Sequence, residues 1–208
     1  MFITFEGGEG SGKTTQVAIL ARHLAGRGYE VVQTREPGGT AMGEAIRAVL
    51  FDERHGHMDA RTELFLYLAS RAQQVEEKIR PALAAGKIVL CDRFTDATWV
   101  YQGYGRRLSH DAILPLLDFA AAGVIPDVTF LLNLDVSVGL ARLSSRGDIN
   151  RFDRETVAFH ETIRQGYLTL ARQHPERIRV IRADADIDTV AEEIRAHTDP
   201  ELPHQKST

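Results

Sequence analysis

The sequence predicts an α/β fold in which a five-stranded, mostly parallel sheet lies between layers of helices. The first observation behind this prediction is a set of short apolar runs, of the kind that forms strands buried on both faces. The second is that amphipathic stretches separate these runs, so successive strands are joined by helical crossovers and should run parallel. The third is the length of 208 residues, which suits one domain with a single core.

The elements follow one another without an internal repeat or a low-complexity linker. We expect strands, in chain order, at residues 1–6, 29–34, 87–92, 127–134 and 178–183. We expect helices at about residues 13–27, 41–51, 60–84, 95–104, 109–122, 136–145, 154–173 and 187–197. The longest helix carries an apolar stripe typical of a core-facing side, made of Leu64, Leu68, Val75, Ile79 and Leu83. Residues 1–198 form the expected domain, and the polar tail, residues 199–208, is expected to be disordered.

Composition and charge narrow the class of protein. Hydrophobic residues at 43% and charged residues at 26% are ordinary for a soluble globular chain. The net charge of -4 argues against a general affinity for nucleic-acid polymers, which usually needs a basic face. The single cysteine, Cys91, excludes an internal disulfide. Because the sequence has no basic-then-apolar leader and no apolar run of about 18 residues, we expect no membrane partner and a cytoplasmic location.

The stretch FEGGEGSGKTTQ, residues 5–16, carries the first chemical signal. It matches the pattern G-x-x-x-x-G-K-[ST] and lies between a predicted strand and a predicted helix. Glycines let successive N–H groups form a nest for anions, and the following helix adds its positive end. Lys13 supplies a charge for the β- and γ-phosphates, while the Thr14 hydroxyl suits Mg²⁺. The predicted phosphate-binding residues are Gly7, Gly8, Glu9, Gly10, Ser11, Gly12, Lys13, Thr14 and Thr15. The motif therefore predicts a three-layer P-loop NTPase fold.

The loop alone leaves two classes open, a regulatory NTPase and a small-molecule kinase. The guanine-reading pattern N-K-x-D is absent from the sequence, and several arginine-bearing stretches suit a second anion. Asp92 and Arg93 come at the carboxyl end of a predicted buried strand, where ligands of open α/β sheets bind. Asp92 could hold a metal through water, and Arg93 could reach phosphate oxygens. The alternative interpretation is an Asp–Arg surface pair that closes the strand.

The stretch TREPGGT, residues 34–40, follows the second predicted strand. Arg35 and Glu36 precede Pro37 and two glycines, a pattern typical of a tight turn. Such a turn would hold two charged groups near the cleft. A solvated turn with incidental charges explains the pattern equally well.

Two helical faces carry residues suited to a nucleotide base. Side chains three and four positions apart share a face of a helix, so each set forms a row. The first row is Tyr67, Arg71 and Gln74, and the second is Thr98, Tyr101 and Gln102. An aromatic ring, a guanidinium and an amide could stack on a base and hydrogen-bond with it. Periodicity alone favours ordinary packing in both rows.

Taken together and in this order, the segments resemble the bacterial thymidylate kinase family. The matching pieces are FEGGEGSGKTTQ, TREPGGT, LFLYLASRAQQ, CDRFTDATWVYQG, PDVTFLLNLD and RGDINRFDRE, which span residue 2 to about residue 185. The resemblance implies phosphorylation of dTMP to dTDP by ATP, with Mg²⁺, in a homodimer. The alternatives are another nucleoside monophosphate or deoxynucleoside kinase and, in a different class, a regulatory NTPase with the same loop.

On the donor side, the resemblance implies that Lys13 and Thr14 hold the ATP phosphates and the metal. Together with the position of Asp92, this gives Thr14 and Asp92 as the predicted metal-binding residues. It extends the ATP-binding set to Arg142. It also implies that Arg93 bridges the donor and acceptor phosphates.

On the acceptor side, the resemblance places Glu9 near the sugar and the acceptor-side metal region. It implies that Tyr67 stacks on thymine, that Arg71 contacts a base oxygen and that Tyr101 packs against the deoxyribose and disfavours a 2′-hydroxyl. It also implies a cis Glu36–Pro37 bond. Thr98 stands where some relatives have Asn. The implied dTMP-binding residues are Glu9, Arg35, Glu36, Pro37, Tyr67, Arg71, Gln74, Arg93, Thr98, Tyr101 and Gln102.

The glycine loop contains no cation before Lys13, so the charge that stabilises the transferring group must come from elsewhere. The polar stretch SSRGDINRFDRE offers Arg146 and Arg151 in a possible lid at about residues 144–153. The alternative is a solvated loop. Asn150 replaces an Asp that is common in the lid of the family. The predicted catalytic residues are Lys13, Arg93, Arg146, Arg151 and Glu9.

Overall fold

A computed structural model describes residues 1–144 and 152–203 of the chain. Its strands are β1 (Phe2–Glu6), β2 (Val31–Arg35), β3 (Ile88–Asp92), β4 (Val128–Asn133) and β5 (Ile178–Arg182). They form one sheet in the order β2–β3–β1–β4–β5, and every neighbouring pair is parallel. The predicted five-stranded parallel sheet is therefore confirmed.

Nine α-helices are present within the described ranges. They are α1 (Lys13–Gly26), α2 (Ala41–Phe51), α3 (Ala60–Gln74), α4 (Arg80–Ala84), α5 (Thr95–Thr98), α6 (His110–Ala121), α7 (Val136–Ser144), α8 (Val157–Gln173) and α9 (Ile187–Thr198). Two π-helical segments, Val75–Ile79 and Trp99–Gly105, and two 3₁₀ turns, Glu53–His55 and Asp199–Glu201, complete the list. None of the helices in the described part of the chain is long and apolar enough to cross a membrane.

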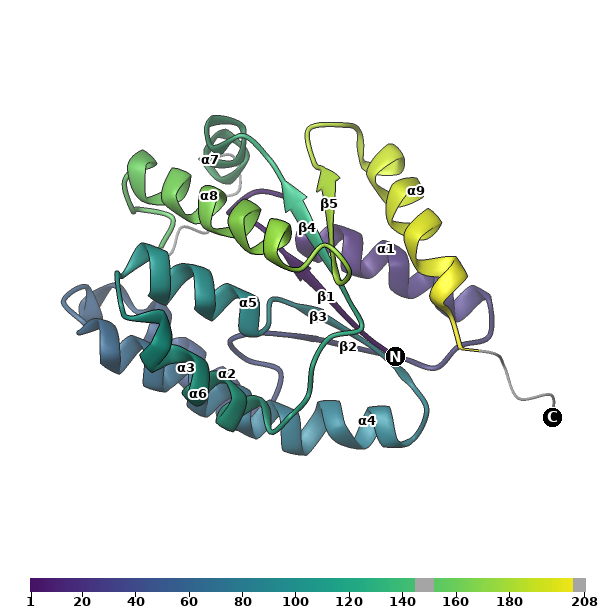
Figure 1. Ribbon diagram of the computed structural model, residues 1–208, viewed down its shortest axis with the longest axis horizontal. Helices are drawn as coiled ribbons and strands as arrows, with labels where there is room; N and C mark the ends of the chain where they lie inside the picture. The colour runs from purple at the N-terminus through teal and green to yellow at the C-terminus, as the bar shows by residue number, and fades with distance from the viewer. Residues whose placement is uncertain (145–151, 204–208) are drawn as a thin grey trace.

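The helices cover both faces of the sheet (Figure 1). Because side chains of a strand alternate between faces, β1 contributes to two cores. Ile3 and Phe5 pack with α1 and α9, whereas Phe2 packs with the π-helical segment Val75–Ile79 on the opposite face. Helices α2, α3 and α6 stack together farther from the sheet, at the lower left of Figure 1. This arrangement leaves the carboxyl ends of the strands together at one edge.

The expectation that every strand is buried on both faces is wrong for the two edge strands. The outer strands β2 and β5 contain exposed residues, because each has a neighbouring strand on one side only and incomplete helix cover. The central strands β1, β3 and β4 are almost fully buried, as predicted. Whether a strand lies at an edge or in the centre of the sheet therefore determines how much of it is exposed.

The predicted helix at residues 60–84 is divided into α3, a π-helical segment and α4. Pro81 lies at the start of α4 and has no backbone N–H to donate, so a regular helical ladder cannot continue through it. The predicted helix at 95–104 is likewise divided, into the single turn α5 and a π-helical segment. Helix α8 begins at Val157 rather than at residue 154, since the Thr156 side chain caps it by accepting from Phe159 N.

Residues 199–203 of the expected tail lie against the domain. Asp199 accepts from His23 Nε2 at 2.9 Å and pairs with Arg27 at 2.7 Å. The Tyr29 hydroxyl donates to the Pro203 carbonyl at 3.0 Å. The chain therefore keeps contact with α1 and the residues that follow it up to residue 203.

Candidate active site

The glycine loop between β1 and α1 is closely packed. Gly10 has φ 68, and a Cβ atom there would lie 2.2 Å from the Gly139 carbonyl oxygen, so glycine is required. Lys13 Nζ donates to the carbonyls of Gly7 at 3.1 Å and Gly8 at 2.8 Å. Burial, assisted by the nearby Arg93, lowers the pKa of Lys13 to about 8. The loop therefore encloses a buried ammonium group with its donors turned toward backbone oxygens.

Thr14 and Asp92 meet at the start of α1. The Thr14 hydroxyl donates to Asp92 Oδ2 at 2.6 Å, which joins the phosphate loop to the end of β3. A hydroxyl and a carboxylate are oxygen ligands suited to Mg²⁺, which takes its remaining ligands from phosphates and water. Among the described residues, no group of three or more His, Cys, Asp or Glu side chains is placed so that it could hold a metal ion.

Glu9, Arg93 and Tyr101 form the centre of the site. Arg93 has φ 71, and its guanidinium donates to Glu9 Oε2 at 2.5 Å and to the Gly7 carbonyl at 3.0 Å. The Tyr101 hydroxyl donates to the other Glu9 oxygen at 2.9 Å, and the Arg93 guanidinium lies 4.9 Å from the Tyr101 ring centroid. Burial raises the pKa of Glu9, but Arg93 and Lys13 outweigh it and hold that pKa below its usual value. Glu9 is therefore a buried carboxylate.

A second carboxyl group, that of Glu6, holds neighbours of Arg93 in place. Sequence reasoning did not predict a role for it. Its two oxygens accept from Phe94 N and from the Tyr167 hydroxyl, both at 2.7 Å. Arg93 in turn donates to that hydroxyl at 3.1 Å. Burial, reinforced by the nearby Asp96, raises the pKa of Glu6 to about 8. The Glu6 carboxyl thus holds the backbone next to Arg93 and, through Tyr167, its side chain.

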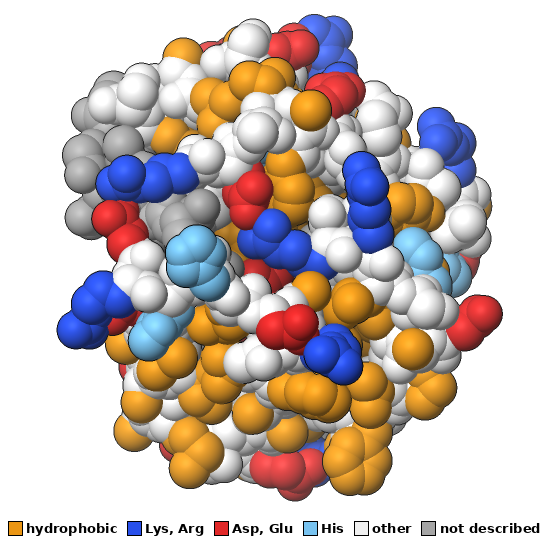
Figure 2. Space-filling view, turned by 90° about the vertical axis from the view of Figure 1, so that its left-hand side faces the viewer, with side chains coloured by type: hydrophobic (Ala, Val, Ile, Leu, Met, Phe, Trp, Pro, Cys, Tyr) orange, Lys and Arg blue, Asp and Glu red, His pale blue; other side chains and the backbone are white. Residues whose placement is uncertain are grey.

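A cavity of about 530 Å³ opens beside the phosphate loop, a volume typical of ligand sites. The structure brings together on its wall eleven of the predicted residues: Glu9, Gly10, Lys13, Glu36, Pro37, Tyr67, Asp92, Arg93, Thr98, Tyr101 and Gln102. Figure 2 shows charged side chains of both signs gathered near the middle of one face of the molecule. Residues from α1, α3, β3 and the segment 98–102 therefore converge on one space.

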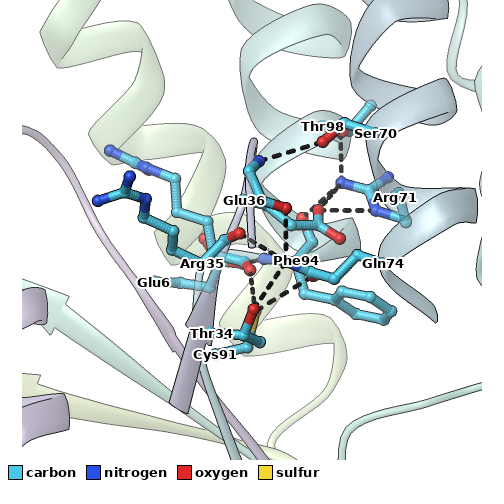
Figure 3. A network of polar contacts seen from close by, with 12 residues as sticks. Glu6, Thr34, Arg35, Glu36, Ser70, Arg71, Gln74, Cys91, Phe94 and Thr98 are labelled. Carbon is cyan, nitrogen blue, oxygen red and sulfur yellow. Dashed lines mark hydrogen bonds and ion pairs between the residues drawn. The ribbon is translucent and has the colours of Figure 1, made fainter. Parts of the chain in front are cut away.

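Arg71 lies behind the cavity wall, in a buried network (Figure 3). Its guanidinium donates to Glu36 Oε2 at 2.6 and 2.8 Å and to the Thr98 hydroxyl at 2.9 Å. Burial raises the pKa of Glu36, and the Arg71 ion pair opposes that rise. Arg71 Nη1 and Glu36 Oε1 are buried without a hydrogen-bond partner in the described structure. Two polar groups beside the cavity are therefore unsatisfied.

Gln74 and Arg35 do not line the cavity. Gln74 Nε2 donates to the carbonyls of Arg35 at 2.6 Å and Gly38 at 3.0 Å, so it holds the turn in place (Figure 3). The Arg35 guanidinium pairs with Glu44 at 2.9 Å, and its side chain is half exposed. The predicted cis Glu36–Pro37 bond is confirmed.

Several lining residues were missed by sequence reasoning. They are Arg47, Phe51, Ala97, Leu143, Phe152 and Asp153. Arg47 and Phe51 are four positions apart on α2, and the Arg47 guanidinium lies 4.3 Å from the Phe51 ring centroid. That spacing was a readable signal for a shared face. Phe152 follows a polar stretch without periodicity, so no comparable signal pointed to it.

The remaining residues to be placed are Arg142 and those of the expected lid. Arg142 of α7 lies beside the phosphate loop, with Nη1 3.4 Å from the Gly10 carbonyl oxygen and 3.3 Å from that of Ala183. Arg146, Asn150 and Arg151 lie outside the described residues.

Comparisons with known proteins agree with this geometry. The family model described as thymidylate kinase matches residues 5–194. A thymidylate kinase of an Exiguobacterium species is 48% identical, over 95% of this chain and 93% of the relative, and one from Gloeobacter violaceus is 47% identical, over 100% and 98%. The crystal structure of thymidylate kinase from Ehrlichia chaffeensis superposes with a TM-score of 0.78 at 36% identity, covering 96% of this chain and 98% of that one. The chain therefore belongs to the thymidylate kinase family.

Proposed function

We propose that the phosphate loop and the neighbouring cavity are the ATP and dTMP sites of a thymidylate kinase. The reaction follows from family membership: ATP phosphorylates dTMP to dTDP. The observation that carries the assignment of residues is the position of Arg93. Its guanidinium contacts both the Gly7 carbonyl of the loop and Glu9 on the cavity wall, so it lies where two nucleotides would meet.

On the donor side, the loop N–H groups and the end of α1 bind the ATP phosphates. Lys13 exchanges its carbonyl partners for β- and γ-phosphate oxygens, which are stronger acceptors because they are charged. Arg142 supports the loop from α7. Thr14 and Asp92 would hold Mg²⁺, which would neutralise phosphate charge when bound.

Transfer itself requires positioning and neutralisation of charge more than covalent chemistry by the protein. Arg93, fixed by Glu9, Gly7 and Tyr167, contacts the phosphate that moves between the nucleotides. We assign the additional positive charge to Arg146 and Arg151, in a lid at about residues 144–153 of the single kinase domain, residues 1–198.

On the acceptor side, Tyr67 stacks on thymine, and Tyr101 packs against the deoxyribose. Arg71 Nη1 supplies a donor for a base oxygen, which supports the proposal because an unsatisfied buried donor costs about 1–3 kcal/mol. Thr98 already accepts from Arg71, so its hydroxyl remains available as a donor. These contacts would orient the base, while Arg93 and Glu9 orient the phosphate and sugar.

A homodimer is also part of the proposal. Large apolar side chains are exposed on the stacked helices α2, α3 and α6: Met42, Val49, Phe65, Leu114 and Phe119. Figure 2 shows hydrophobic side chains gathered on the lower part of the displayed face, the level at which these helices lie in Figure 1. Such faces are typical of interfaces between subunits. We place the enzyme in the cytoplasm, with its nucleotide substrates.

A coupled assay of ADP release across nucleotides tests the assignment. We expect turnover of dTMP and little of dCMP, AMP, thymidine or the ribose analogue of dTMP. Equal rates on thymidine and dTMP would contradict an acceptor site built around Arg93. ATP hydrolysis without any phosphorylated product would favour the regulatory NTPase instead.

A further inference from the structure

Arg106 connects three segments beside the acceptor cavity without lining it. It follows the π-helical segment Trp99–Gly105, which carries Tyr101. Its Nε donates to Glu63 Oε1 of α3 at 3.1 Å, and its Nη1 donates to Glu155 Oε1 at 2.6 Å. The guanidinium also lies 5.4 Å from the Phe152 ring centroid. We call the two ion pairs of Arg106 with Glu63 and Glu155 the Arg106 bridge.

One end of the bridge is anchored in the protein interior. The Glu63 side chain is 1% exposed and also accepts from Gln102 Nε2 at 2.8 Å. A buried carboxylate is retained only when it is paired, so Glu63 fixes the position of Arg106. Glu63 lies one helical turn before Tyr67, the residue assigned to the base.

The other end of the bridge holds the turn at residues 152–155. Glu155 N donates to the Phe152 carbonyl at 3.1 Å, so the two residues close one turn. Phe152 is 3% exposed and lines the acceptor cavity. Its ring makes edge contacts with Tyr67 at 6.3 Å and Tyr101 at 6.1 Å between ring centroids. A shift of this turn would move Phe152 relative to the two aromatic residues assigned to the nucleotide.

We propose that Arg106 is a positioning residue for the acceptor nucleotide, which acts by holding Phe152 against Tyr67 and Tyr101. The inference rests on the proposed function, since it takes the cavity as the dTMP site. Arg106 contacts no reacting atom, so the bridge should affect binding of dTMP far more than the transfer step or binding of ATP.

The test compares steady-state kinetics of variants of the full chain. Glu155→Ala removes the Phe152 side of the bridge and leaves the buried Arg106–Glu63 pair intact, so the fold is preserved. Since aromatic pairs contribute about 0.5–1.5 kcal/mol, we expect KM for dTMP to rise about three- to tenfold. We expect kcat and KM for ATP to change by less than about twofold, which is smaller than the expected rise in KM for dTMP. Arg106→Lys, which keeps the charge but loses the planar fork, should give a smaller rise.

Arg154→Ala is the matched control. Arg154 neighbours Glu155 and forms an exposed ion pair with Glu53 at 2.6 Å, which is of little energetic consequence. We expect wild-type KM for dTMP in this variant.

A double-mutant cycle shows whether the bridge acts through Phe152. Phe152→Ala should raise KM for dTMP, and adding Glu155→Ala should raise it no further. Wild-type KM for dTMP in Glu155→Ala and Arg106→Lys, or a full additional rise in the double variant, would overturn the inference. Failure of the proposed function would differ, because the wild-type enzyme itself would then fail to turn over dTMP.

Discussion

The two halves of the cleft, the proposed donor site and the proposed acceptor site, differ in the kind of groups that line them. The proposed donor half centres on one continuous stretch, residues 7–14, whose backbone groups and single lysine would surround the phosphates. The acceptor half is assembled from side chains of at least four separate segments, including α2, α3, the segment 98–102 and Phe152. The backbone N–H donors of the loop are kept when side chains are substituted. In the acceptor half, by contrast, many side chains each contribute part of the binding energy. Substitutions should therefore affect the donor half in few positions but strongly, and the acceptor half in many positions but moderately.

The largest effect is expected at Lys13. Lys13→Ala removes the one cation inside the loop, and loss of a preorganised charge-stabilising donor costs about 10²- to 10³-fold in kcat. Single-turnover phosphorylation of dTMP measures this. Lys87→Ala, which removes a lysine paired with Glu30 at the surface, is the control and should be unaffected. A Lys13→Ala enzyme with near wild-type kcat would show that the donor half does not depend on its lysine.

The next effect concerns the proposed lid. Arg146→Ala or Arg151→Ala should lower kcat by about 10²-fold or more, in line with the contribution of arginine fingers. KM for dTMP should change little, because the charge is needed at the transferring phosphate. Unchanged kcat in both single variants and the double variant would leave the charge to Arg93 alone, and the donor half would then be complete without a lid.

A moderate effect is expected in the acceptor half. Tyr67→Ala should raise KM for dTMP by about tenfold, since a base stacked on an aromatic ring gains about 1–3 kcal/mol. The value of kcat should be largely kept. Tyr67→Phe retains the ring and serves as the control. A large fall in kcat with unchanged KM would contradict the separation of the two halves.

The smallest effect is on the pH dependence of stability. Because the folded-state pKa of Glu6 is about 8 against 4.5 for the free group, its contribution to stability is complete below pH 4.5 and is lost as the pH rises to 8. Glu6→Gln lacks this titration. The Tm of the variant minus that of the wild type should therefore increase between pH 5 and pH 8, by about 3 °C or more. A constant difference in calorimetric scans would show that Glu6 is not protonated in the fold.

The same contrast between the halves explains which parts of the structure could be predicted from the sequence. Strands, helices and the phosphate loop are local patterns, so their order and the position of Lys13 and Thr14 at the start of α1 could be predicted. Edge exposure of β2 and β5 depends on strand order, which is not local. The interruption of the predicted helix near Pro81 could have been predicted from the proline itself. The apolar stripe of residues 60–84 indicated one continuous helix instead.

The acceptor half was predicted only in part. An arginine in a helical row suggests an exposed side chain, because arginines are seldom fully buried, yet Arg71 is 1% exposed and lies behind the wall. Gln74 likewise holds a turn rather than lining the cavity. The spacing of Arg47 and Phe51 indicates a shared helical face, but that this face and Phe152 line the cavity depends on the packing of distant segments.

Glu9 gives one oxygen to Arg93 and the other to Tyr101, so a single carboxylate joins the residue proposed for transfer to the residue proposed for the sugar. This sharing matters for anyone who redesigns the enzyme to accept ribonucleotides or sugar-modified analogues. Replacing Tyr101 to widen the sugar pocket also removes a hydrogen bond to Glu9 and frees that carboxylate to move with Arg93. On the proposed roles of these residues, we therefore expect a broadened substrate range to come with slower turnover. A redesign should replace Tyr101 with a smaller residue that still donates to Glu9.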